Sequence, residues 1–105
     1  MTKLVRSFAA LGDATRMAIV ERLLDKGALC AGDLLDVADV SPPAISRHLK
    51  VLREAGVITQ KIDRQRRIYS VRQGAVEEIN TWTMSRKEFW GKSLDRLMIA
   101  LHIED

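Results

Sequence analysis

The chain of 105 residues has one cysteine, two prolines and few aromatic residues, which make up 5% of the sequence. A single cysteine excludes a disulfide within the chain, and with it a disulfide-stabilised secreted domain. No apolar run approaches the roughly 18 residues of a membrane-spanning helix, and residues 1–7 lack the apolar centre of a signal peptide. We therefore expect a cytoplasmic protein with no membrane partner, built as one domain over residues 1–105.

The sequence also lacks the groups of residues that enzymes use. It contains no paired carboxylates at a predicted pocket, no Ser/His/Asp set, no glycine-rich phosphate loop and no cluster of metal ligands. His48 and Cys30 fall on different predicted elements, without a third group to orient them. The sequence therefore predicts neither an enzyme nor a bound cofactor or metal.

Positive charge, by contrast, is concentrated in one segment. Residues 41–72 carry eight Lys or Arg residues against Glu54 and Asp63, a balance of +6, whereas the whole chain has a formal net charge of +3. Basic charge confined to one part of a small domain is typical of a surface that faces nucleic-acid phosphates. Double-stranded DNA is the expected partner, because the chain lacks the aromatic platform on which RNA bases stack.

Apolar residues at helical spacing predict four helices in the first half of the chain, over residues 4–11, 13–26, 31–37 and 41–55. Asp13 is a good N-terminal cap for the second helix, and Ser41 is one for the fourth, which Gly56 ends. Pro42 fits the first position of the fourth helix, where its missing N–H costs nothing. The residues expected to be buried on these two helices are Ile19, Val20, Leu23, Leu24, Ile45, Leu49 and Leu52.

After Gly56 the spacing changes to near-alternation. Residues 57–63 and 67–72 predict two strands of a hairpin, joined by a polar turn over residues 63–66. Helical spacing returns from residue 75 to 103, and we leave open whether Gly91 breaks this last helix. The predicted fold is mainly α with a small β-hairpin, a winged helix-turn-helix of order α-α-α-α-β-β-α.

In a helix-turn-helix, the exposed side of the recognition helix enters the major groove. Arg47 points away from the predicted core and can bond bidentately to guanine O6 and N7, whereas Lys50 suits a phosphate. An arginine at the hairpin turn can enter a narrow minor groove. The DNA-binding region is predicted at about residues 31–72, with contacts from Ser41, Pro43, Ala44, Ser46, Arg47, His48, Lys50, Arg64, Gln65, Arg66 and Arg67.

Some of these roles have alternatives. His48 either braces the turn or reaches the DNA backbone. Thr15 and Arg16, at the start of the second helix, either contact phosphates or are purely structural. Tyr69 is expected to pack against the core, with its hydroxyl at the rim.

The terminal helices carry more apolar residues than so small a core can bury. Stripes of this length usually bury against another chain, so we expect a homodimer that reads an inverted repeat. A ligand pocket lined by the aromatic residues of the last helix (Trp82, Phe89 and Trp90) is the alternative. Dimerisation is predicted through about residues 3–12 and 75–103, with Leu4, Phe8, Leu11, Trp82, Phe89, Trp90, Leu94, Leu97 and Leu101 in the interface.

Four segments resemble the ArsR/SmtB family of small bacterial winged-helix repressors. They are FAALGDATR at residues 8–16, LCAGDL at 29–34, ISRHLKVLREAG at 45–56 and RRIYSV at 66–71. The resemblance covers residues 4–72 well, and the last helix only in kind. It implies a homodimer in the bacterial cytoplasm, associated with the nucleoid, that binds an operator and represses transcription. In some members of the family an inducer relieves the repression, and the sequence leaves open whether this chain has one.

The chain also departs from the family's patterns. Members that sense thiophilic metals carry a Cys-x-Cys pair, but here Cys30 is followed by Gly32 at the second position. Other members bind zinc through Asp/His and His/Glu pairs on the last helix, where this chain has a single histidine, His102, near the end. Pro42 and Pro43 stand where relatives often have Gln-Ser contacts to DNA, so the operator is expected to differ. The long last helix, with Trp82, Phe89, Trp90 and residues 94–97, resembles the metal-independent branch of the family.

The sequence thus predicts a sequence-specific DNA-binding transcriptional regulator, a homodimeric repressor of an inverted-repeat operator. Two alternatives remain. One is a protein-interaction module in which DNA binding is vestigial. The other is a repressor that responds to oxidants through Cys30, a residue otherwise expected to be small and buried.

Overall fold

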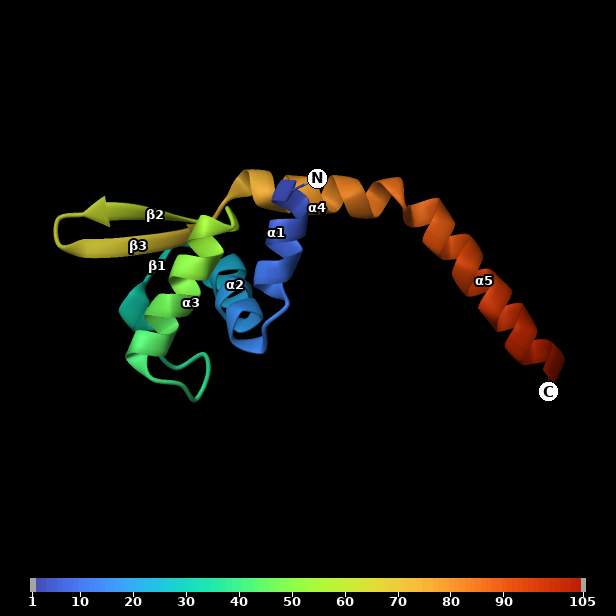
Figure 1. The fold of residues 1–105 in the computed structure, drawn as a ribbon, viewed down its shortest axis with the longest axis horizontal. Helices are drawn as coiled ribbons and strands as arrows, with labels where there is room; N and C mark the ends of the chain where they lie inside the picture. Colours follow the sequence, from blue (N-terminus) through green and yellow to red (C-terminus); the bar gives the residue numbers. More distant parts are fainter. Residues whose placement is uncertain (1, 105) are drawn as a thin grey trace.

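A computed structural model describes residues 2–104, apart from the side chains of Thr2, Glu88, Phe89, Ile103 and Glu104. The elements along the chain are α1 (Thr2–Leu11), α2 (Ala14–Lys26), β1 (Leu29–Cys30), the 3-10 turn η1 (Ala31–Leu34), α3 (Pro42–Glu54), β2 (Ile58–Asp63), β3 (Arg66–Val71), α4 (Gln73–Ser85) and α5 (Lys87–Glu104). This is the predicted winged helix-turn-helix, in which α2 and α3 pack beside a three-stranded sheet (Figure 1).

The predicted caps are present at the ends of α2 and α3. The Asp13 carboxylate accepts two backbone N–H groups of the first turn of α2, at 2.9 and 3.0 Å. The bond from the Arg16 N–H contributes most to holding the pKa of Asp13 below its usual value. The Ser41 hydroxyl accepts a first-turn N–H of α3 at 3.3 Å. Gly27 and Gly56, which follow the two helices, have φ of 84° and 78°, the left-handed conformation that favours glycine.

The core lies where α1, α2, η1 and α3 meet the sheet. The predicted core residues are buried, except that Leu24 is 58% exposed, so its assignment to the core is wrong. Leu24 lies at the edge of the buried side of α2, where it borders a surface groove between α2 and α4. The buried apolar side chains are Ala10, Ile19, Val20, Leu23, Leu34, Ile45, Leu49, Leu52, Val57, Ile58, Tyr69 and Ala75.

The sheet has the order β1-β3-β2, and both pairings are antiparallel. Strands β2 and β3 form the predicted hairpin, the wing, with bounds within one residue of those expected. Asp63 pairs with Arg66, so that Arg64 and Gln65 form the loop at the tip. Arg64 has φ of 61°, a conformation usually left to Gly, Asn or Asp. Figure 1 shows the wing projecting beyond α3, away from the helical body.

The predicted helix over residues 31–37 is wrong. Leu29 and Cys30 instead pair with β3 as a third strand, and only Ala31–Leu34 form a single 3-10 turn. Gly32 and Asp33 have low helix propensity, and a segment this short gains little from helix formation. The pairing of Leu29 with Tyr69 is a tertiary contact, which local spacing does not reveal.

The last helix is broken, but not at Gly91. Helix α4 ends at Ser85, and α5 begins at Lys87 and contains Gly91. Near the break, the Thr83 and Ser85 hydroxyls donate to backbone carbonyls of the preceding turn, at 2.9 and 2.7 Å. Such side-chain bonds compete with the helix ladder and often bend or end helices.

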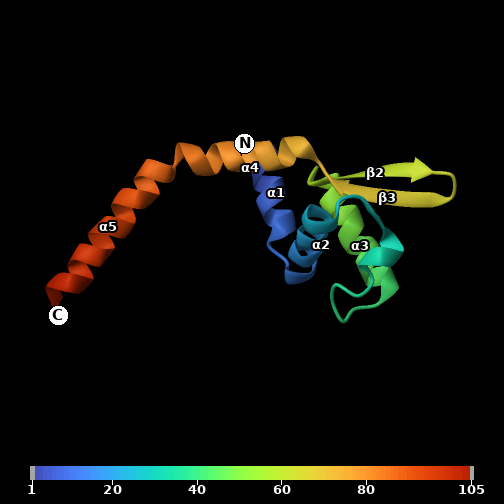
Figure 2. The same cartoon turned by 180° about the vertical axis from the view of Figure 1, so that it is seen from behind.

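Helices α4 and α5 form an arm. Figures 1 and 2 show α4 lying across the end of α1, and α5 leading away from the body. The molecule measures 62 × 28 × 23 Å and has a radius of gyration of 17.7 Å. A compact domain of about 100 residues has a radius of gyration of about 13 Å, so the arm accounts for a much extended shape. Within residues 2–104, none of the helices combines the length and apolar character that crossing a bilayer requires.

Candidate nucleic-acid interface

Helix α3 turns one side to the core and the other to solvent. Ile45 and Leu49 are buried, whereas Ser46, Arg47 and Lys50 are exposed. Lys50 Nζ lies 3.9 Å from a carboxylate oxygen of Glu54, one turn further along the helix. An exposed pair of this kind is weak, so Lys50 can exchange its partner for a phosphate at little cost. The exposed side of α3 therefore presents three cations, since Arg53 is exposed as well, and a hydroxyl.

His48, between these residues, is half-buried and faces Arg16 of α2. The two side chains meet at 3.3 Å, between His48 Nδ1 and Arg16 Nη1. Because a guanidinium only donates, Nδ1 acts as the acceptor. Arg16 Nε also donates to the Ala10 carbonyl of α1, at 2.6 Å. Arg16 thus joins α1, α2 and α3. This geometry fits a structural role for Arg16 and a bracing role for His48, the alternatives to DNA contact.

The first turn of α3 holds the remaining predicted contacts of this helix. The Ser41 hydroxyl is engaged as the cap, although the residue is exposed. Pro43 is exposed and Ala44 is half-buried. Because neither Pro43 nor Ala44 has a polar side chain, the first turn can offer DNA mainly apolar contact.

The wing carries the other cations. Arg64, Gln65, Arg66 and Arg67 are all exposed. Arg66 turns back toward β1, where Nη2 donates to the Cys30 sulfur at 3.1 Å and raises the pKa of the guanidinium. Cys30 itself is half-buried rather than buried. Side chains alternate along a strand, so Arg67 lies on the opposite face from Arg66.

A small pocket of about 160 Å³ separates α3 from the wing. In it, Arg53 donates to the Gln60 side-chain oxygen, and Gln60 Nε2 donates to the Tyr69 hydroxyl at 3.3 Å. Tyr69 is 7% exposed, which confirms that it packs into the core. Its hydroxyl accepts the Gln60 bond beside the pocket that Tyr69 helps to line. The lining residues are Ser46, Lys50, Arg53, Gln60, Arg67 and Tyr69.

Three of these lining residues, Arg53, Gln60 and Tyr69, were missed as candidate site residues. Two sequence signals point to them. Arg53 lies seven residues after Ser46, on the same side of the helix. Gln60 is directly opposite Tyr69 once the hairpin register is known. Only the packing of α3 against the wing brings the two signals together.

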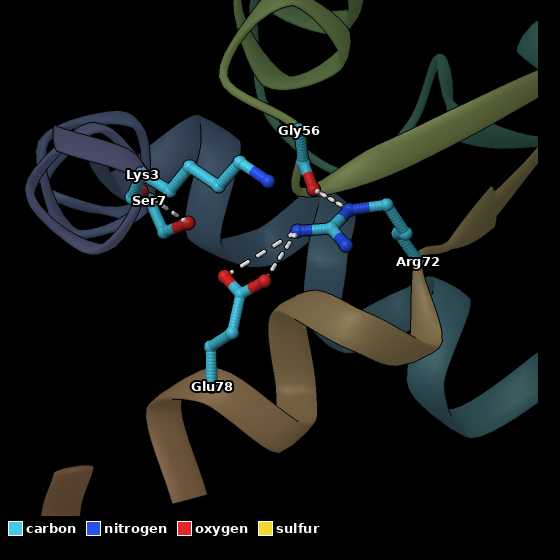
Figure 3. A network of polar contacts seen from close by, with 5 residues as sticks. All are labelled: Lys3, Ser7, Gly56, Arg72 and Glu78. Carbon is cyan, nitrogen blue, oxygen red and sulfur yellow. Dashed lines mark hydrogen bonds and ion pairs between the residues drawn. The ribbon is translucent and has the colours of Figure 1, made fainter. Parts of the chain in front are cut away.

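Arg72 belongs to the basic segment but does not face outward with it. Its Nε donates to the Gly56 carbonyl at 2.5 Å, and its Nη2 donates to the two Glu78 carboxylate oxygens at 3.3 and 3.5 Å (Figure 3). Figure 3 also shows Lys3 of α1 extending toward this group. Arg72 therefore joins the end of α3, the base of the wing and α4.

The predicted interface residues fall into two groups. Where α1 meets α4, Leu4 and Leu11 are half-buried, and the rings of Phe8 of α1 and Trp82 of α4 meet edge to face within one chain, with centroids 5.5 Å apart. On α5, the side chain of Phe89 lies outside the described residues. The other α5 residues of the set are largely exposed: Trp90 by 49%, Leu94 by 59%, Leu97 by 55% and Leu101 by 56%.

The structure also bears on a ligand pocket and on a metal site. Trp82 borders an open groove of about 600 Å³ between α1 and α4, and Lys3, Leu4 and Glu78 line it too. Trp90 is not part of this lining, so the groove differs from the aromatic ligand pocket considered above. Among the residues that the structure describes, no group of three or more His, Cys, Asp or Glu side chains is placed to hold a metal ion.

Known proteins share both the sequence and this geometry. A family model described as a helix-turn-helix domain matches residues 11–61. The HTH-type transcriptional regulator Rv2034 of Mycobacterium tuberculosis is 38% identical over 89 residues, which cover 85% of this chain and 79% of the relative. The transcriptional repressor SdpR of Bacillus subtilis is 33% identical over 78 residues, 74% of this chain and 86% of the relative.

The fold comparison agrees with the sequence comparison. The crystal structure of the ArsR family transcriptional regulator RHA00566 superposes with a TM-score of 0.75 at 25% identity, covering 85% of this chain and 97% of that one. Helix α3 holds the position of the recognition helix in a helix-turn-helix, the helix that enters the major groove. The chain therefore belongs to the ArsR family of winged helix-turn-helix proteins, and it is a DNA-binding transcriptional regulator rather than an enzyme.

Proposed function

We propose that this regulator is a homodimeric repressor that binds a short inverted-repeat operator on the bacterial nucleoid. The observation that carries the proposal is the exposure of Arg47 and Lys50 on α3 together with that of the arginines of the wing. Arg47 suits a bidentate contact to guanine, whereas Lys50, Arg64 and Arg67 suit phosphates. In this assignment about residues 31–72 bind DNA, and about residues 3–12 and 75–103 form the dimer.

The exposed stripe of α5 supports the dimer. Trp90, Leu94, Leu97 and Leu101 recur at three- and four-residue spacing, so they share one side of the helix. Burying each large apolar side chain stabilises an assembly by about 1.5–3 kcal/mol. A second copy supplies the same stripe by symmetry, and a twofold axis would place two recognition helices about 34–36 Å apart, one turn of DNA.

Operator recognition is tested by sequencing the genomic DNA that the purified protein retains. We expect an inverted repeat, bound more tightly than random duplex. The logarithm of the association constant should fall with the logarithm of salt concentration, by about 0.9 per phosphate neutralised. Equal binding to random duplex, or indifference to salt, would contradict the proposal. Retention of a protein in place of DNA would favour the interaction module.

Arg47→Ala tests the readout residue. Loss of a bidentate base contact should weaken operator binding by about 1–3 kcal/mol and relax the preference at one base pair of each half-site. Arg96→Ala on α5 removes the same charge away from α3 and serves as the control in the same gel-shift titration. If Arg47→Ala leaves the operator preference intact, another residue reads the base.

We place the chain in the metal-independent branch of the family. Gly32 at the second position of the family's Cys-x-Cys pair supports this assignment. Addition of arsenite or zinc should then leave the operator complex intact. Release of the operator by either would contradict the assignment.

A second candidate function, repression that responds to oxidants, is favoured by the hydrogen bond from Arg66 of the wing to the Cys30 sulfur. Peroxide would oxidise the thiol to a sulfenic acid and disturb this bond. Peroxide should then weaken operator binding by the wild type and not by Cys30→Ser. An equal response of both proteins would exclude this role.

A further inference from the structure

We propose that the pocket between α3 and the wing binds one phosphate of the DNA backbone, and that the Tyr69 hydroxyl donates a hydrogen bond to it. Such a site presupposes the operator binding proposed above and adds a specific ligand, a phosphodiester group, to it. In this proposal Tyr69 contacts the phosphate, and Arg53 and Gln60 are positioning residues. Three features of the pocket support it.

The first feature is the composition of the pocket walls. On α3, Ser46, Lys50 and Arg53 are spaced by four and three residues, so they share one side of the helix. On the wing, Arg67 and Tyr69 alternate along β3 and therefore share the face on which Tyr69 meets Gln60. No carboxylate lines the pocket among the described residues, although Glu54 pairs with Lys50 from outside it. Three cations and neutral donors face a space of about 160 Å³, which suits a small anion.

The second feature is the direction of the hydrogen bonds. A guanidinium only donates, so Arg53 fixes the Gln60 amide with its oxygen toward Arg53 and its nitrogen toward Tyr69. Gln60 Nε2 then donates to the Tyr69 oxygen. Because that oxygen already accepts a bond from Gln60, the hydroxyl proton of Tyr69 is left to be donated elsewhere, and the pocket is the space beside it.

The third feature is the rigidity of the Tyr69 ring. Tyr69 is 7% exposed and pairs with Leu29 of β1 on one side and Gln60 of β2 on the other. The hydroxyl is therefore held at a fixed height between the recognition helix and the wing. A phosphate bonded there would carry no base information, but it would fix how deeply α3 sits in the major groove.

The experiment compares Tyr69→Phe with the wild type on the selected operator and on operators that carry a single methylphosphonate, one backbone position at a time. Tyr69→Phe keeps the buried ring and removes only the donor. We expect about a tenfold or greater loss of affinity, as for a hydrogen bond to a charged group. The salt dependence should stay unchanged because tyrosine is neutral, whereas Arg67→Gln should lower its slope by about one.

The site is identified by combining the protein substitution with each methylphosphonate substitution and asking whether their effects on affinity add. At one backbone position in each half-site, methylphosphonate should weaken Tyr69→Phe less than it weakens the wild type, because the hydroxyl bond is already absent while the contacts of the three cations remain. Gln60→Ala should lower affinity in the wild-type background and have no further effect in Tyr69→Phe. Ser70→Ala is the matched control, because the Ser70 hydroxyl pairs with Thr59 at 3.1 Å on the other face of the wing. Thermal unfolding of each variant checks its fold.

Three outcomes would overturn the site: wild-type affinity in Tyr69→Phe, an equal effect of methylphosphonate on both proteins at every position, or a loss in Ser70→Ala that matches that in Tyr69→Phe. A wild type that does not prefer its operator would instead overturn the proposed function itself.

Discussion

The winged body, from α1 to β3, and the arm, α4 and α5, have similar apolar spacing, but the body buries its apolar side chains and the arm leaves most of them exposed. Among the described residues, the buried apolar side chains of the body lie between Ala10 and Tyr69, and the arm contributes only Ala75. On α5, Leu94 and Leu97 have the same three-residue spacing as Leu49 and Leu52 of α3, yet they remain more than half exposed. Helical spacing therefore indicates which side of a helix favours burial, but not whether the same chain buries it; on α5 we propose that a second copy does.

The largest expected effect of breaking this contrast comes from charging the arm. Leu94→Glu together with Leu97→Glu would place two carboxylates in the proposed interface, where unpaired charge is costly. We expect a monomer at micromolar concentration and operator binding weakened by about 100-fold or more, because both half-sites must be bound together. Analytical ultracentrifugation and gel shift measure the two effects.

The control for this variant is Arg96→Glu, which changes the net charge by the same two units from a different side of α5. It should remain dimeric. A dimeric Leu94→Glu/Leu97→Glu protein would show that the arm is not the interface.

A matched pair of Leu→Ala substitutions, with effects of intermediate size, tests the same difference between body and arm. Leu52 is fully buried in the body, so Leu52→Ala should lower the free energy of unfolding by about 2–5 kcal/mol. Leu101 is 56% exposed, so Leu101→Ala should leave the stability of the monomer unchanged and weaken only the dimer. Urea unfolding at two protein concentrations separates these effects. A large, concentration-independent loss in Leu101→Ala would place that residue in the core of its own chain.

The smallest expected effect lies where body and arm meet. A Cβ added to Gly74 would collide with the Arg72 guanidinium, which holds α4 to the end of α3. In the wild-type background, Gly74→Ala should leave the free energy of unfolding nearly unchanged, because the loss of the Arg72 bonds offsets the gain in helix propensity. In an Arg72→Ala background, Gly74→Ala should stabilise the protein by about 0.5–1 kcal/mol. Thermal unfolding of the four proteins gives the coupling, and additive effects would show that Arg72 does not join the two regions.

Local sequence was enough to predict much of the body. Capping residues such as Asp13 and Ser41 act within one helical turn, and the stripe of Ile45, Leu49 and Leu52 follows from helix geometry alone. The wing was predictable for the same reason, since its strands are adjacent in sequence and its turn is short.

Features that depend on distant residues were not predictable in this way. Strand β1 exists because Leu29 meets Tyr69, forty residues later in the sequence. Arg72 looks like another phosphate contact until Glu78 and Gly56 are seen beside it. The candidate phosphate pocket requires the register of the wing and its packing on α3 together, so no single segment indicates it.

The interruption at Arg86 between α4 and α5 has a consequence for which operators the proposed dimer can span. In that dimer, the break at Arg86 would connect the DNA-binding part of each chain to the helix α5 at the twofold axis. The angle between α4 and α5 would then set the separation of the two recognition helices along the duplex. Substitutions that change the angle between α4 and α5 would change the preferred spacing between half-sites, while every residue that contacts a base stays the same. Spacing and sequence preference could then evolve independently in such a protein.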